Sequence, residues 1–150
     1  MVDWKDATEI ILALTTLAMF FAALMSMRQT NKVIEQMSQD RREKYLLTKR
    51  NDIRGLLGKV ISNLLWMHIE APRRVPTSNF QNRIETVEEW IVNLEDPELE
   101  DMVRSYIARC ESNKQLLPLD KELHEMVQKK KKELEKALKE LDEEIERLAG

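Results

Sequence analysis

The chain has 150 residues, with 24 basic and 27 acidic side chains and a formal net charge of −3, so it has no global attraction for nucleic acid. Its one cysteine, Cys110, excludes an intramolecular disulfide framework and an all-cysteine metal site. Leu, Glu and Lys dominate, whereas Gly and Pro number only three and four, and this composition predicts an all-α fold.

Residues 10–27 contain no charged side chain, although 34% of the whole chain is charged. As a helix this segment extends about 27 Å at 1.5 Å per residue, close to the roughly 30 Å hydrocarbon core of a bilayer. Trp4 precedes it, where an interfacial aromatic residue would anchor one end. The sequence therefore predicts a transmembrane helix whose large apolar side chains include Ile10, Leu14, Leu17, Phe20, Phe21 and Leu24.

Two alternatives explain the same segment. A cleavable signal peptide begins with a positive region, but here Lys5 stands against Asp3, Asp6 and Glu9. A core helix of a soluble protein that is apolar on every side needs complete burial, and the rest of this chain is small for that purpose. A membrane helix is the favoured interpretation.

Basic residues follow the apolar segment directly. Residues 28–54 hold eight basic and four acidic side chains, and such an excess stays on the cytoplasmic side. We therefore expect residues 1–9 to form a short extracytoplasmic tail and the body of the protein to be cytoplasmic. The excess acts either as a topology signal alone or also as a contact for anionic lipid headgroups, and its members nearest the membrane are Arg28, Lys32, Arg41 and Arg42.

Residues 28–44 are predicted to form a polar helical neck, with a thin apolar stripe at Val33, Ile34 and Met37. Residues 45–118 show three- and four-residue apolar spacing, which predicts a helical bundle that has about four helices when the last helix is included. Gly55 and Gly58 each weaken a helix interior by about 1 kcal/mol, which indicates either close approach of a neighbouring helix or a local break.

Proline and capping residues predict the helix boundaries in this bundle. Pro72 should end a helix near Ala71. We expect one of three residues, Thr77, Ser78 or Asn79, to cap the next helix. The Asp96–Pro97 pair should begin another helix, since Asp is a good N-cap and Pro suits the first helical position.

Residues 119–150 are predicted to form a long C-terminal helix from about 121 to 148, with Asp120 as a possible cap. The spacing of 4, 3, 4 and 3 residues near its end is typical of a coiled-coil seam. We expect the N-terminal half to dock on the bundle and the C-terminal half to project or to pair with a partner helix. The seam consists of Leu134, Leu138, Leu141, Ile145 and Leu148.

Small residues recur every four positions within the apolar segment, at Ala18, Ala22 and Ser26. This spacing lets two membrane helices approach closely. Together with the seam it predicts a homo-oligomer, or association with a helical protein partner.

No motif in the sequence carries recognisable chemistry. We find no phosphate-binding loop, nucleophile elbow or zinc-protease motif, and His68 and His124 lack the Glu that precedes a di-iron histidine. His68 is interpreted as a surface or capping residue, Cys110 as a small core residue, and Trp66 and Trp90 as core residues. No catalytic, cofactor-binding or metal-binding residue is therefore assigned, and no small-molecule substrate is expected.

The basic run Lys129–Lys132 lies in a helix of balanced charge and is interpreted as a solvated face, so no nucleic-acid partner is expected. The favoured hypothesis is a single-pass, non-enzymatic interaction or scaffold protein, with membrane lipid as one partner. The alternative is a small accessory or regulatory subunit of a membrane complex such as a transporter or an energy-coupling machine. An unrecognised helical hydrolase or metal enzyme is the least favoured.

Overall fold

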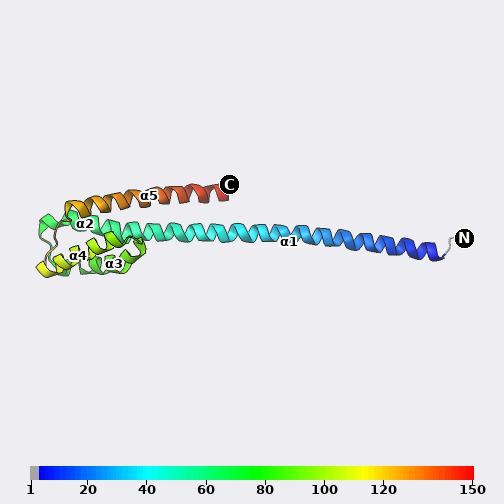
Figure 1. Ribbon diagram of the computed structural model, residues 1–150, viewed down its shortest axis with the longest axis horizontal. Coiled ribbons are helices and arrows are strands. Elements are labelled where there is room, and N and C mark those ends of the chain that lie inside the picture. Colours follow the sequence, from blue (N-terminus) through cyan, green and yellow to red (C-terminus); the bar gives the residue numbers. More distant parts are fainter. Residues whose placement is uncertain (1–3) are drawn as a thin grey trace. The chain divides into compact units, whose positions relative to one another are not determined.

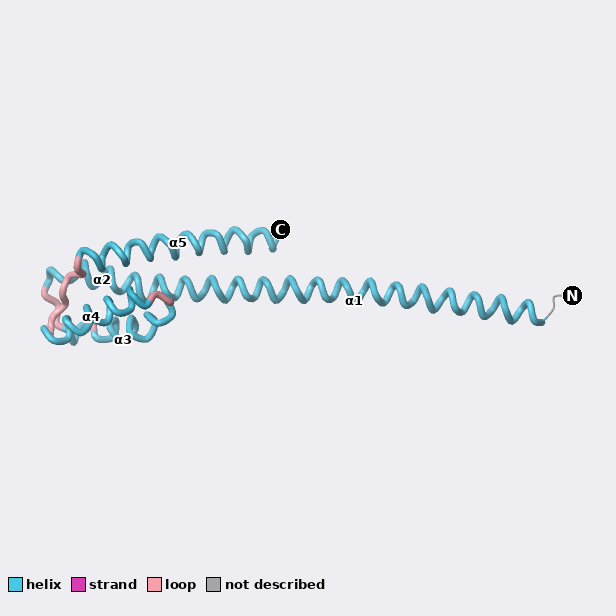
Figure 2. Tube along the Cα trace, in the orientation of Figure 1, coloured by secondary structure: helices cyan, strands magenta, loops and turns pink. Residues whose placement is uncertain are grey.

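The computed structural model describes residues 4–150, and within that range the chain consists of helices joined by short loops, with no strand, as the composition predicts (Figures 1 and 2). Residues 1–3, the first part of the expected extracytoplasmic tail, lie outside the described range, and residues 4–9 form the first turns of a helix. The five α-helices are α1 (Trp4–Leu56), α2 (Ser62–Glu70), α3 (Gln81–Trp90), α4 (Pro97–Asn113) and α5 (Lys121–Ala149).

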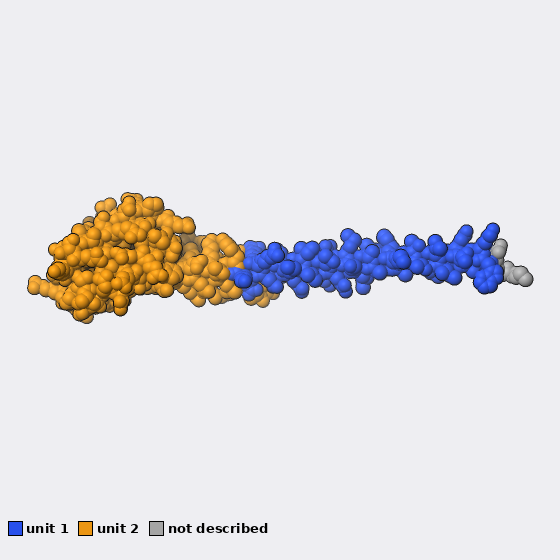
Figure 3. Space-filling view, turned by 90° about the horizontal axis from the view of Figure 1, so that it is seen from below, with its two compact units in different colours: residues 1–44 blue, residues 45–150 orange. Residues whose placement is uncertain are grey.

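The chain divides into two units, residues 1–44 and residues 45–150 (Figure 3). The described part of the first unit belongs to α1 and contains no buried residue. The second unit contains the end of α1 and all the other helices. Its buried residues form one large cluster and one smaller cluster.

The large cluster forms because each helix of the second unit turns an apolar face toward the same interior, as the three- and four-residue spacing predicts. No polar or charged residue is buried among the described residues, so charged faces point to solvent. The residues with no measurable or almost no exposure include Val60, Leu64 and Met67 before and within α2, Phe80, Ile84 and Val87 around α3, Leu99, Val103 and Tyr106 in α4, and Leu123 and Val127 in α5.

A π-helical segment, Leu57–Ile61, joins α1 to α2, and the two glycines flank or occupy it. A Cβ atom on Gly55 would lie 2.8 Å from Cζ3 of Trp90, so close approach of a neighbouring side chain explains this glycine. A Cβ atom on Gly58 would meet nothing within 4 Å. Close approach is therefore confirmed at Gly55, whereas at Gly58 the helix does not break but continues in π-helical form.

The expected boundaries hold at two places. Helix α2 ends at Glu70, just before the short 3₁₀ turn that contains Pro72. Asp96 caps α4, where its Oδ1 accepts a hydrogen bond of 3.2 Å from the Leu99 backbone N–H, and Pro97 is the first helical residue.

One expected cap is wrong, and another is confirmed in its position only. Thr77, Ser78 and Asn79 form a 3₁₀ turn of their own, and α3 begins after Phe80 without a side-chain cap. Asp120 is the N-cap residue of α5, as expected, but its carboxylate is paired with Arg109 and makes no capping hydrogen bond.

Candidate functional site

The apolar segment of α1 is exposed along its whole length. The most hydrophobic 18-residue window of this helix has a mean hydropathy of 2.2 with none of its residues buried, so α1 is long and apolar enough to cross a membrane. Exposed apolar surface of this extent marks a protein or membrane interaction surface in a folded protein. The exposed fractions of the six large side chains singled out above run from 41% at Leu24 to 62% at Leu14 and Phe20.

The two threonine hydroxyl groups inside this segment are satisfied by the helix itself. Thr15 Oγ1 donates a hydrogen bond of 2.8 Å to the carbonyl of Ile11, and Thr16 Oγ1 donates one of 2.8 Å to Leu12. Such bonds lower the cost of placing a hydroxyl in an apolar solvent. The small residues Ala18, Ala22 and Ser26 are exposed on the same helix.

Polar side chains flank the segment at both ends. Trp4 is 84% exposed on one side, and Arg28 and Lys32 are exposed on the other, as are Arg41 and Arg42 further along the first unit. The aromatic and basic side chains are thus exposed, so a membrane surface or a partner protein could contact them.

The C-terminal seam packs against this chain's own α1. Leu141 is buried with Leu46 and Ile53 of α1, and the other seam residues surround the same small cluster as half-buried side chains: Leu134, Leu138, Ile145 and Leu148. Figure 1 shows α5 running beside the last part of α1. The expectation that this half of α5 projects, or pairs with a partner helix, is corrected, because α1 presents matching apolar residues within the same chain.

One polar pair accompanies this seam. Arg50 follows Leu46 by four residues and precedes Ile53 by three, so it occupies a position in the apolar stripe of α1. Its Nη1 lies 3.5 Å from Oδ1 of Asp142 in α5. In the observed register of α1 against α5, Arg50 and Asp142 therefore bring opposite charges together beside the apolar seam.

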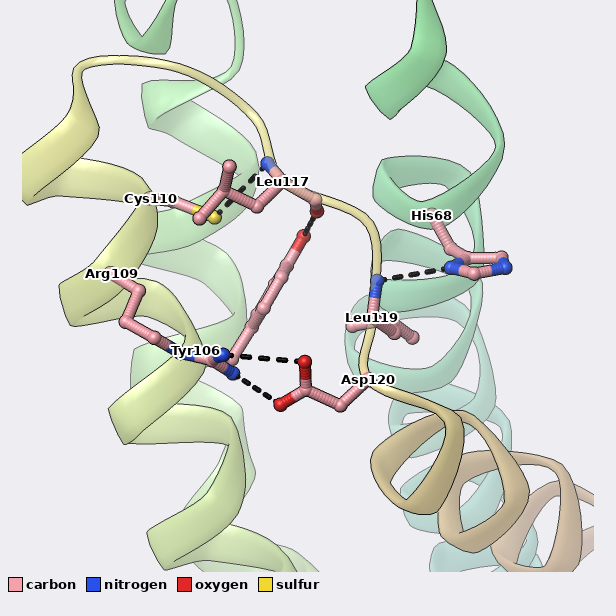
Figure 4. Close-up of polar contacts among 7 residues, drawn as sticks. All are labelled: His68, Tyr106, Arg109, Cys110, Leu117, Leu119 and Asp120. Carbon is pink, nitrogen blue, oxygen red and sulfur yellow. Dashed lines mark hydrogen bonds and ion pairs between the residues drawn. The ribbon is translucent and has the colours of Figure 1, made fainter.

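A second cluster of polar contacts holds the loop between α4 and α5 (Figure 4). The Tyr106 hydroxyl donates a hydrogen bond of 2.7 Å to the Leu117 carbonyl, and the Leu117 N–H lies 3.5 Å from Cys110 Sγ. Burial, with a further contribution from Cys110, raises the pKa of Tyr106. This hydroxyl therefore stays protonated and acts as a structural donor.

His68 holds the far end of the same loop. Its Nδ1 accepts a hydrogen bond of 3.0 Å from the Leu119 N–H, and its ring stacks on His124 with centroids 4.4 Å apart. Burial lowers the pKa of His68, and the neighbouring His124 lowers it further. The interpretation of His68 as a surface or capping residue is corrected, because a contact 51 residues away in sequence uses its unprotonated nitrogen.

Helices α4 and α5 hold each other's first residues. Arg109 of α4 bonds Asp120 in front of α5 at 2.6 Å, and Lys130 of α5 lies 3.1 Å from the α4 cap, Asp96. The hydrogen bond from Arg109 lowers the pKa of Asp120, and the Leu99 N–H followed by Lys130 lowers that of Asp96. The interpretation of Lys129–Lys132 as a solvated face is corrected at Lys130, which is also held by a second ion pair, to Glu133 at 3.3 Å.

The remaining singled-out residues lie in or beside the large cluster. Cys110 is 1% exposed, which confirms it as a core residue. Trp66 and Trp90 are partly buried, and each carries a cation on its outer face: Arg83 lies 4.0 Å from the Trp66 ring centroid and Lys59 lies 4.2 Å from that of Trp90.

The arrangement of these groups favours positioning over chemistry. The hydrogen bonds of Tyr106, Cys110 and His68 all end on backbone atoms of one loop, so they fix that loop. Within residues 4–150, no group of three or more His, Cys, Asp or Glu side chains could hold a metal ion. No family model, curated protein or solved structure matches this chain.

Proposed function

We propose that this protein is a single-pass membrane-anchored, non-enzymatic interaction protein whose second unit works in the cytoplasm. The observation that carries the proposal is the uncharged, fully exposed segment 10–27 of α1. The hydrogen bonds of Tyr106, Cys110 and His68 all hold one loop, which supports a structural role for this cluster and not a catalytic one.

The energy of insertion favours lipid for this segment. Its eight Ile, Leu and Phe residues contribute roughly −0.3 to −0.6 kcal/mol each near the centre of a membrane helix, or a few kcal/mol together. The bonded hydroxyls of Thr15 and Thr16 remove part of the opposing polar cost. In water the same side chains would remain exposed at full hydrophobic cost.

Charge supports an orientation with the N-terminus outside. Eight basic and four acidic residues follow the segment between positions 28 and 54, and translocation of such a basic stretch is disfavoured. A cytoplasmic second unit held by one anchor meets membrane-bound partners at a raised effective concentration. Tethering is therefore the mechanism we propose.

The anchor is tested by alkaline extraction of membranes that contain the full chain. We expect the protein to stay in the membrane pellet and to enter solution only with detergent. Release into the alkaline supernatant would contradict the anchor and, with it, the tethering role.

Orientation is tested separately with single cysteines at Thr8 and Gln39 in a Cys110→Ala background. A membrane-impermeant maleimide should label Thr8→Cys in intact cells and Gln39→Cys only after the inner face is opened. The reverse pattern would overturn the orientation and leave the anchor standing.

The interaction role is tested by purification in mild detergent. Recovery of the chain alone, as a self-assembled species, supports an independent interaction protein. Recovery with other subunits in fixed stoichiometry supports an accessory subunit of a larger membrane complex.

A further inference from the structure

The first unit carries a second apolar stripe, which begins at the last residue of the hydrophobic segment and which no described residue covers. Its large side chains, Met27, Ile34 and Met37, are 64%, 58% and 49% exposed, and the adjoining Val33 is 52% exposed. Ordinary water-exposed helices place polar residues on every face that lacks a partner. An exposed apolar stripe on a neck that is otherwise polar therefore indicates a surface that binds a partner.

The stripe has the spacing of a coiled-coil core. Met27, Thr30, Ile34 and Met37 follow one another at steps of three, four and three residues. Thr30 Oγ1 donates a hydrogen bond of 2.9 Å to the Ser26 carbonyl, so its hydroxyl is already satisfied and its methyl group is free to pack. The same repeat continues back into the apolar segment through Ala23, Phe20, Thr16 and Ala13.

Charge is absent from the borders of the stripe. The flanking positions are Ser26, Asn31, Val33 and Ser38, all uncharged. At 100° per residue, the charged residues Arg28, Lys32 and Glu35 lie about 120°, 160° and 100° around the helix from Ile34. Two copies that meet along the stripe therefore bring no like charges together between Ser26 and Ser38.

From this segregation of charge we propose that the stripe Met27–Thr30–Ile34–Met37 pairs with the same stripe of a second copy as a parallel two-helix coil. The inference rests on the proposed anchor, because insertion in one direction holds both copies parallel and at the same depth. A surface that meets its own copy must be self-complementary, and an apolar stripe with uncharged borders meets that condition.

The sequence also sets where the pairing ends. The next two positions of the repeat are Arg41 and Lys44. In a parallel pair each would face its own copy across the seam, and like charges at core positions are destabilising. The coil thus covers the segment directly after the membrane and stops before the second unit begins.

Cysteine cross-linking of the full chain in membranes tests this geometry. In a Cys110→Ala background, Ile34→Cys and Met37→Cys should form disulfide-linked dimers under mild oxidation. The matched controls are Gln29→Cys and Gln36→Cys, about 140° and 160° from Ile34 around the helix. We expect roughly ten-fold more dimer at the stripe than at the controls, because only the stripe holds its thiols at high effective concentration.

Placing charges on the stripe gives an independent readout. Ile34→Lys with Met37→Lys should convert a dimer in mild detergent to a monomer, as measured by light scattering with correction for detergent. Gln29→Lys with Gln36→Lys adds the same two charges to the opposite face and should leave the dimer intact.

Equal cross-linking at all four positions, stronger cross-linking at the glutamine positions, or none at all would overturn the proposed coil. So would an unchanged mass after the Ile34→Lys and Met37→Lys substitutions. Alkaline extraction of the same samples keeps the two proposals separate: a protein that remains in the membrane without stripe cross-links loses only the coil, whereas a released protein loses the anchor.

Discussion

The two units of this chain treat the same residue types in opposite ways. In the first unit, Phe20 and Leu17 lie 62% and 56% exposed, whereas Phe80 and Leu64 in the second unit are 1% and 0% exposed. The second unit closes its apolar faces on one another, while the described part of the first unit has no fold of its own to hide them. The apolar side chains of the first unit therefore depend on an external solvent or partner, whereas residues 45–150 carry their own core.

Two arginines in the apolar segment should break this contrast most severely. Leu17→Arg with Phe20→Arg costs about 5–7 kcal/mol near the centre of a span, more than the whole favourable contribution of the segment. We expect loss of membrane retention in alkaline extraction. Leu17→Met with Phe20→Leu is the matched control and should remain in the pellet; retention of the double arginine variant would contradict membrane insertion.

Leu141→Ala should weaken the second unit by about 2 kcal/mol, because it empties the centre of the small cluster shared with Leu46 and Ile53. Urea unfolding of a 45–150 fragment measures the loss, and Leu148→Ala at the half-buried helix end should lose less. If Leu141→Ala changed the mass of the assembly without changing the unfolding midpoint, the seam would belong to another chain.

The two glycines near the π-helical segment should respond with opposite signs. Gly55→Ala forces a Cβ against the Trp90 ring and should destabilise the 45–150 fragment by about 1–3 kcal/mol. Gly58→Ala meets open space and should stabilise the fragment by up to about 1 kcal/mol. Thermal unfolding of both variants checks the pair, and equal effects would contradict the close approach at Gly55.

Asp96→Ala should cost about 1 kcal/mol through loss of the α4 cap. The lowered pKa of Asp96 means that its contribution is complete above the ordinary value of 3.8 and is lost as pH falls through the lowered pKa. Asp96→Asn keeps a capping oxygen but removes the charge, so its stability should vary less between pH 5 and pH 2. Urea midpoints at both pH values provide the measurement.

His68 should produce the smallest effect. Its pKa is lowered from 6.5, so the unfolded chain binds a proton more readily, and the stability contributed by the Leu119 contact is complete above pH 6.5 and declines as pH falls through the lowered pKa. His68→Asn should flatten this decline. Proton NMR titration of the two imidazole rings follows it directly, and a His68 pKa at or above 6.5 would contradict the assignment.

The sequence predicted those features that depend on local spacing or on a single residue. The all-α fold, the Asp96 cap, the end of α2 before Pro72 and the burial of Cys110 follow from helix propensity, capping chemistry and apolar periodicity. The candidate span followed from an uninterrupted uncharged run, which is the strongest local signal in the chain.

Contacts between distant segments were not predictable in this way. His68 and Leu119 meet only after α2 and the loop before α5 have packed together, and no local sequence pattern near either residue predicts the contact. The Leu134–Leu148 repeat specified a partner helix but not its origin, because a heptad pattern is the same for an intrachain and an interchain mate. Asp120 is a residue type that often caps helices, but its carboxylate pairs with Arg109.

The crossed pairs Arg109–Asp120 and Lys130–Asp96 have one more consequence, for the alignment of α4 and α5. Each pair is partly exposed and adds little free energy by itself. A slip of one helix along the other by a single turn, about 5.4 Å, would separate both pairs at once. The two ion pairs therefore disfavour a slipped alignment, in addition to the buried apolar contacts and the hydrogen bonds that hold the loop between the helices.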